Sequence, residues 1–131
     1  MASIQEAFVA YTEAQLPTVG KGYPNLVPAD ATPAWSYRIM DDEEQMAHSG
    51  GTGFYFARIE VQVFADKSLT DGAYKKAQAQ ADAIRALWHG YKGAIGAVNV
   101  HYCRVSKSDN YGELRELPAE RLEVFINYRL D

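Results

Sequence analysis

The chain has 131 residues and a formal net charge of −4, with 47% hydrophobic and 12% aromatic residues. These values predict one folded domain and exclude an intrinsically disordered chain. The acidic balance argues against a protein that grips phosphate backbones, because that role needs clustered Lys and Arg. Cys103 is the only cysteine, which excludes an intrachain disulfide and favours a reducing cytoplasm. We expect neither a signal peptide nor a transmembrane helix.

The N-terminal segment predicts a helix from Ile4 to about Leu16. Apolar residues recur there at helical spacing, as on one face of an amphipathic helix. Ser3 and Glu6 form a capping-box pattern at its start, and Pro17 ends it.

Residues 18–33 contain three prolines, which exclude a central strand and predict an irregular approach to the sheet. Residues 35–40 predict the first strand, with Trp35, Tyr37 and Ile39 on one face. The following segment Asp41–Gly53 is acidic, glycine-rich and long. Because loops of this length in a small domain are usually functional or disordered, we expect a mobile hairpin loop.

The segment Phe54–Ala65 predicts a long strand with strict apolar alternation on one face. Its other face combines polar side chains with Phe54, Phe56 and Phe64. A sheet with one solvated face would carry few aromatics there. We therefore expect this second face to meet another element of the chain or another chain, and both alternatives stay open.

A second helix is predicted from Thr70 or Asp71 to about His89, with Gly90 just after its end. Its expected buried stripe is Tyr74, Ala77, Ala81, Ile84 and Trp88. Two more strands are expected. The first runs from Val98 to Val105, and its residues on one face are Val98, Val100, Tyr102 and Arg104. The second runs from Arg121 to Leu130, where Phe125 interrupts a polar face.

The element order is therefore α-β-β-α-β-β. This order predicts a single α+β domain over residues 1–131, with an antiparallel or mixed four-stranded sheet and its helices packed on one face. The surplus phenylalanines would lie on the other face.

We find no pattern typical of a catalytic, cofactor or metal site. His101 and Cys103 would share a strand face, but a structural zinc site commonly needs a second such pair. The acidic run Asp41–Glu44 lacks the spacing of a calcium loop. The glycines from Gly50 to Gly53 precede a strand, whereas a phosphate-binding loop opens a helix. We expect no enzyme activity, no cofactor and no bound metal.

Two segments resemble the tail-completion proteins of long-tailed phages, also called tail terminator or tail-to-head joining proteins. The first is Ile59-Glu60-Val61-Gln62-Val63-Phe64-Ala65-Asp66 with the Ala-rich helix that ends at Leu87-Trp88-His89-Gly90. The second is the final Arg121-Leu122-Glu123-Val124-Phe125-Ile126-Asn127-Tyr128. Tyr23-Pro24 and Pro28 match an early proline stretch of that family.

The resemblance implies a structural subunit of the virion, assembled in the host cytoplasm. Copies would form a homo-oligomeric ring, expected to be a hexamer, that caps the tail tube protein and docks to the head connector or stopper protein. DNA would pass through the channel without sequence-specific binding, and no membrane would be involved. The alternative is a small cytoplasmic ligand-binding module or enzyme, with its pocket between the second helix and the sheet.

A ring needs contacts in which one patch meets a different patch on the neighbouring subunit. The acidic loop and the phenylalanine-bearing face are the two candidate patches. The predicted interface residues are Asp41, Asp42, Glu43, Glu44, His48, Phe54, Phe56 and Phe125.

Overall fold

The computed structural model describes residues 4–17, 20–24, 34–48, 50–64, 73–96, 98–108 and 119–130. Two helices and six strands are found in these ranges. In chain order they are α1 (Ile4–Gln15), β1 (Lys21–Pro24), β2 (Ala34–Ala47), β3 (Gly50–Phe64), α2 (Ala73–Trp88), β4 (Gly93–Ile95), β5 (Val98–Ser108) and β6 (Ala119–Leu130).

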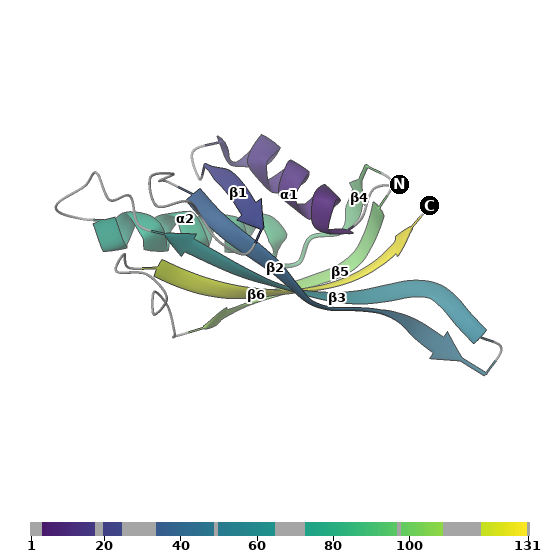
Figure 1. The fold of residues 1–131 in the computed structure, drawn as a ribbon. Coiled ribbons are helices and arrows are strands. Elements are labelled where there is room, and N and C mark those ends of the chain that lie inside the picture. Colours follow the sequence, from purple (N-terminus) through teal and green to yellow (C-terminus); the bar gives the residue numbers. More distant parts are fainter. Residues whose placement is uncertain are drawn as a thin grey trace.

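The strands form one sheet in the order β1-β2-β3-β6-β5-β4, which curls into a half-barrel (Figure 1). β1 runs parallel to β2, and the other neighbours are antiparallel. The prediction of a four-stranded sheet in the order α-β-β-α-β-β was therefore wrong. β1 contains Pro24 and lies at the sheet edge, where a missing backbone donor is tolerated. β4 has only three residues, too few to give a periodic signal.

The two helices take different places in this half-barrel. α2 packs across β3, β5 and β6, whereas α1 contacts β1 and β4, the strands at the two edges of the sheet. Both helices lie on the inner side of the curl (Figure 1), but the sheet that they cover has six strands instead of the predicted four. α1 spans the opening of the curl, so its position depends on strands that the sequence pattern did not reveal.

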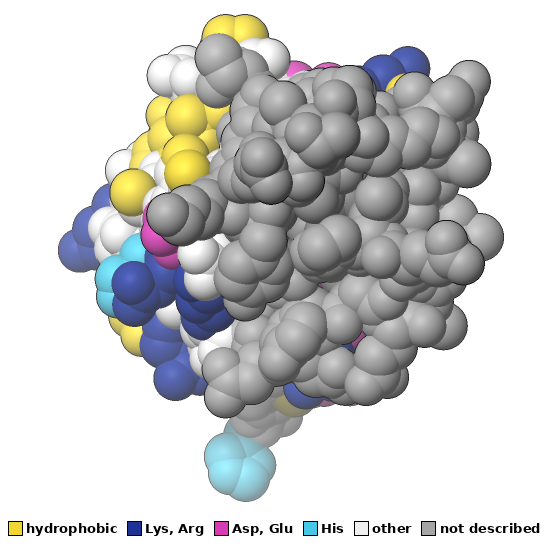
Figure 2. Space-filling model, turned by 90° about the vertical axis from the view of Figure 1, so that its left-hand side faces the viewer, with side chains coloured by type: hydrophobic (Ala, Val, Ile, Leu, Met, Phe, Trp, Pro, Cys, Tyr) yellow, Lys and Arg dark blue, Asp and Glu magenta, His cyan; other side chains and the backbone are white. Residues whose placement is uncertain are grey.

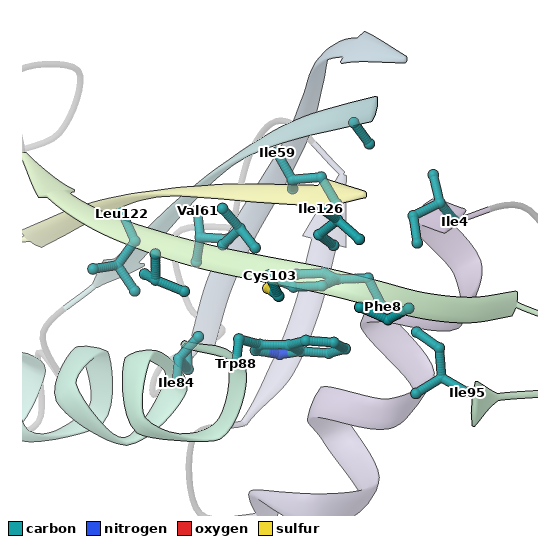
Figure 3. Close-up of a cluster of buried hydrophobic side chains, with 14 of the residues drawn as sticks. Ile4, Phe8, Ile59, Val61, Ile84, Trp88, Ile95, Cys103, Leu122 and Ile126 are labelled. Atoms are coloured by element: carbon teal, nitrogen blue, oxygen red, sulfur yellow. The ribbon is translucent and has the colours of Figure 1, made fainter. Parts of the chain in front are cut away.

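The core lies between α2, α1 and the inner face of the sheet (Figure 3). The Trp88 and Phe8 rings stack with their centroids 4.7 Å apart. Trp88 Nε1 donates a hydrogen bond to Thr12 Oγ1 at 2.9 Å, and this hydroxyl donates to the Phe8 carbonyl at 2.7 Å. The predicted burial of Ala81, Ile84 and Trp88 is confirmed. The two helices are thus joined by the contacts of the Trp88 ring with Phe8 and Tyr11 and by one buried hydroxyl.

Several predictions fall outside the described parts of the chain. These are the caps at Ser3 and at Thr70 or Asp71, the side chains of Phe64, Tyr74 and Ala77, and most of the stretch between residues 106 and 120. The end of α2 is described, and Gly90 follows it with φ 82°, as predicted for a glycine that terminates a helix.

We expect Thr12→Val to lower the free energy of unfolding by about 1–3 kcal/mol, because it leaves the buried Trp88 Nε1–H without an acceptor while keeping the side-chain volume. Chemical denaturation monitored by tryptophan fluorescence would measure this loss. Thr52→Val is the matched control, since the Thr52 hydroxyl is exposed and bonds only within a surface hairpin. Equal stability of the two variants would contradict the structural role given to Thr12.

Candidate functional site

β2 and β3 continue past the neighbouring strands as a projecting two-stranded hairpin (Figure 1). β6 pairs with β3 only as far as Phe54, whereas β2 and β3 stay paired to Ala47 and Gly50. We call residues Glu44–Gly53 the hairpin arm. The prediction of a mobile loop over Asp41–Gly53 was wrong, because the described part of this segment is paired strand. Neither face of the arm is buried, so its sequence shows no apolar alternation to reveal it.

The arm is held by few contacts of its own. Thr52 Oγ1 donates to the Gln45 carbonyl at 2.9 Å, and Gly53 N donates to Glu44 Oε2 at 3.0 Å. Met46 is 71% exposed. A two-stranded hairpin is at best marginally stable in water. The arm therefore adds little to the stability of this domain and presents its surface outward.

Two β-bulges frame a regular stretch of β2 at the base of the arm. The register with β3 shifts before Asp41 and again after Glu44, and is continuous between them. Asp41 and Glu43 consequently lie on the sheet face opposite the core, which we call the convex face. Asp42 and Glu44 lie on the core side.

Tyr128 of β6 fastens the core side of this stretch. Its hydroxyl donates to Asp42 Oδ1 at 2.6 Å, and its ring stacks on Tyr55 at 5.3 Å. Burial raises the pKa of Tyr128, and the hydrogen bond to the Asp42 carboxylate raises it further. Tyr128 therefore remains a protonated donor at neutral pH and anchors the base of the arm to the centre of the sheet.

The convex face carries the phenylalanines, as the alternation predicted. Phe56 is 48% exposed. The Arg104 guanidinium lies 4.5 Å from the centroid of the Phe125 ring, and Phe54 meets the His101 ring edge-on at 5.2 Å. α1 buries Ile4 and Phe8 in the core on the other side of the sheet, so this helix does not cover the convex face.

A shallow groove of about 360 Å³ runs along the convex face at the base of the arm. Its lining residues are Asp41, Glu43, Phe56, Ala57, Arg58 and Phe125. The structure thus brings together four of the eight predicted interface residues. Asp42 and Glu44 face the core side, His48 lies exposed at the turn of the arm, and Phe54 packs on His101 further along β3.

A charged network that the sequence did not indicate lies beside this groove. Glu60, whose side chain is only 10% exposed, forms ion pairs with Arg121 and, at 3.5 Å, with Arg38. Arg121 is also 3.6 Å from Glu123. Glu60 and Glu123 are direct neighbours across β3 and β6, and such like charges destabilise a sheet unless they are compensated. The two arginines supply that compensation, but only the strand register places them there.

His101 and Cys103 were expected to share a face, and this was wrong. The register of β5 shifts between Val100 and Tyr102, so His101 meets Phe54 while Cys103 is buried in the core. Burial raises the pKa of the Cys103 thiol to about 12. Within the described ranges, no group of three or more His, Cys, Asp or Glu residues is placed to hold a metal ion.

In the described part of α2, Ala81, Ile84 and Trp88 fill the space in which the alternative placed a pocket. An open, mainly apolar groove of about 450 Å³ lies instead between α1 and β4. It is lined by Glu6, Ala7, Ala10, Tyr11, Ile95 and Gly96. Among the described residues that line this groove, Glu6 is the one acidic residue, and none is Ser, Cys or His.

The acidic run Asp41–Glu44 lies at the base of the arm. At the end of the molecule opposite the arm, Lys and Arg side chains gather beside a hydrophobic strip on the described part of the surface (Figure 2). Neither described helix is long and apolar enough to cross a membrane. No protein-family model matches the chain, and no curated protein matches it. The arm and the groove beside it are thus the candidate site on geometry alone.

Proposed function

We propose that this protein is a structural assembly subunit of a phage or prophage tail. Copies join into a hexameric ring that caps the tail tube and docks to the head connector, while DNA passes through the channel. The observation that carries the proposal is the hairpin arm, which projects from a domain that does not need it for its core. The resemblance of the β3, α2 and β6 sequences to tail-completion proteins is the reason for proposing that the assembly is a phage tail.

The convex face supports the same proposal. Exposed apolar patches mark contact surfaces, and here Phe56 is 48% and Tyr102 53% exposed on strands whose other face is core. The groove and the arm are different patches on one subunit. A ring closes through such unlike patches, since each subunit offers one to each neighbour.

Native mass spectrometry and negative-stain electron microscopy over a range of protein concentrations test this proposal. We expect hexameric rings, or monomers that form rings at high concentration or on contact with purified tail tubes. A protein that stays monomeric at every concentration and does not bind tail tubes would show that the proposed function is wrong.

A further inference from the structure

We propose that the outer edge of β2 binds an extended, basic segment of an adjoining virion protein by strand addition. This inference rests on the proposed function, and it assigns a partner of stated chemistry to one surface of the subunit. Its basis is a strand edge that no described strand pairs with, acidic side chains along that edge and the groove on the convex face beside them.

The edge of β2 is open over most of its length in the described chain. β1 pairs with β2 only from Ala34 to Tyr37, so the edge beyond Tyr37 has no described strand partner. Residues 41–48 are all exposed. An unpaired edge presents a row of backbone donors and acceptors to any extended peptide. The bulges confine the regular part of this edge to Asp41–Glu44.

On the opposite side of the sheet, described residues occupy part of the edge of β5. Gly90 N donates to the Cys103 carbonyl at 2.8 Å, and Val105 N donates to His89 Nδ1 at 3.1 Å. The turn after α2 therefore uses the backbone groups of β5 that a partner strand would need. Strand addition is consequently directed to β2.

Charge selects the kind of segment that fits this edge. Four consecutive carboxylates line the regular stretch, and Glu43 is the one for which the described contacts include no ion pair or hydrogen bond. A strand laid against β2 would place alternate side chains beside Asp41 and Glu43, above the Phe56 ring. Lys or Arg at those positions would meet opposite charge and an aromatic face.

The same carboxylates disfavour two other occupants. Two copies joined through the β2 edge would set acidic residues opposite acidic residues, which destabilises the pair. Nucleic acid would bring phosphates to the same carboxylates, where binding requires cations. The strand that fits is basic and comes from a different protein.

The test uses a synthetic peptide of about ten residues in which lysine and threonine alternate, long enough to cover the open part of β2. Its binding to the intact protein is followed by fluorescence anisotropy, and the contacted residues by amide chemical shifts. We expect the shifts to be confined to β2 and its flanks. We also expect the double variant Asp41→Asn with Glu43→Gln to bind the peptide about fivefold or more weakly. Each exposed ion pair contributes less than the 1.4 kcal/mol that corresponds to a tenfold change in affinity, and this variant removes two of them.

Two controls separate strand addition from simple charge attraction. Asp82→Asn removes a carboxylate from the exposed surface of α2 and should leave peptide affinity unchanged. A peptide with N-methyl groups along one edge keeps its charge but loses backbone donors, so it should not bind.

Absence of binding at millimolar peptide, shifts centred away from β2, or equal binding of the methylated peptide would each overturn the inference. The outcome is independent of the oligomer measured in the same samples. If the protein forms rings but does not bind the peptide, only the proposal of strand addition is wrong. If it binds the peptide at β2 but stays monomeric, only the proposed function is wrong.

Discussion

Trp88→Ala is expected to destabilise the domain by about 3–5 kcal/mol, a large share of the stability of a domain of this size. Trp88 is fully buried, stacks on Phe8 at 4.7 Å and meets the ring of Tyr11 edge-on at 5.3 Å. Its removal leaves a cavity where α1, α2 and the sheet meet, and it also removes the donor to Thr12. Urea denaturation followed by circular dichroism would measure the change.

Trp88→Phe and Arg85→Ala are the controls for this substitution. Phenylalanine keeps most of the ring stack but lacks the Nε1–H. The free energy of unfolding of Trp88→Phe should therefore lie between those of the wild type and Trp88→Ala. Arg85 lies exposed one turn earlier on the same helix, and its truncation should change stability by no more than about 0.5 kcal/mol. An unchanged melting temperature for Trp88→Ala would show that α1 and α2 are not joined in the way described.

Shortening the hairpin arm is expected to abolish ring formation while leaving the domain folded. The variant replaces residues 45–52 with Asn-Gly, so that the four-residue loop Asn-Gly-Gly53-Phe54 joins the paired residues Glu44 and Tyr55, a loop length that is common in hairpins. The deleted residues pair only with one another, as in the Met46–Gly51 and Ala47–Gly50 pairs. A longer deletion that reached Asp42 would also remove the acceptor of Tyr128 and confuse assembly with stability.

Thermal unfolding and native mass spectrometry measure the two effects separately. The melting temperature should stay within about 4 °C of wild type, a change of no more than roughly 1 kcal/mol for a domain of this size. Met46→Ala keeps the length of the arm and removes its most exposed apolar side chain. It therefore shows whether ring formation depends on the length of the arm or on this apolar contact. Rings of normal size formed by the shortened variant would contradict the role given to the arm.

The sequence predicted best those elements that bury one face. β3 and β6 alternate because Ile59, Val61, Leu122 and Val124 all point into the core, and the second helix shows its stripe for the same reason. The hairpin arm has no buried face, and its glycine-rich sequence, preceded by the acidic residues Asp41, Asp42 and Glu43, resembles a loop. β1 and β4 are too short to produce a pattern and owe their existence to neighbouring strands.

The candidate site was predictable in its chemistry but not in its geometry. The sequence indicated that Phe56 and Phe125 lie away from the core, which is confirmed by their place on the convex groove. It could not indicate that Asp41–Glu44 form a regular strand, whose alternation places these four residues on two faces. The same limitation applied to β5, where a bulge places Tyr102 and Arg104 opposite the core although Val98 and Val100 are buried. One extra residue reverses every later side chain of a strand.

The central position of β6 also governs how the polypeptide can fold during synthesis. β6 follows every other described strand in the chain yet lies between β3 and β5, and its Arg121 reaches back across 61 residues to Glu60. Until the ribosome has released β6, the strands that carry Val61 and Cys103 cannot be part of one sheet, and these side chains cannot share one core. Contacts between such distant residues form late because closing the intervening chain costs entropy. A prematurely terminated product would thus remain a chaperone or protease substrate and could not enter an assembly as a partly formed subunit.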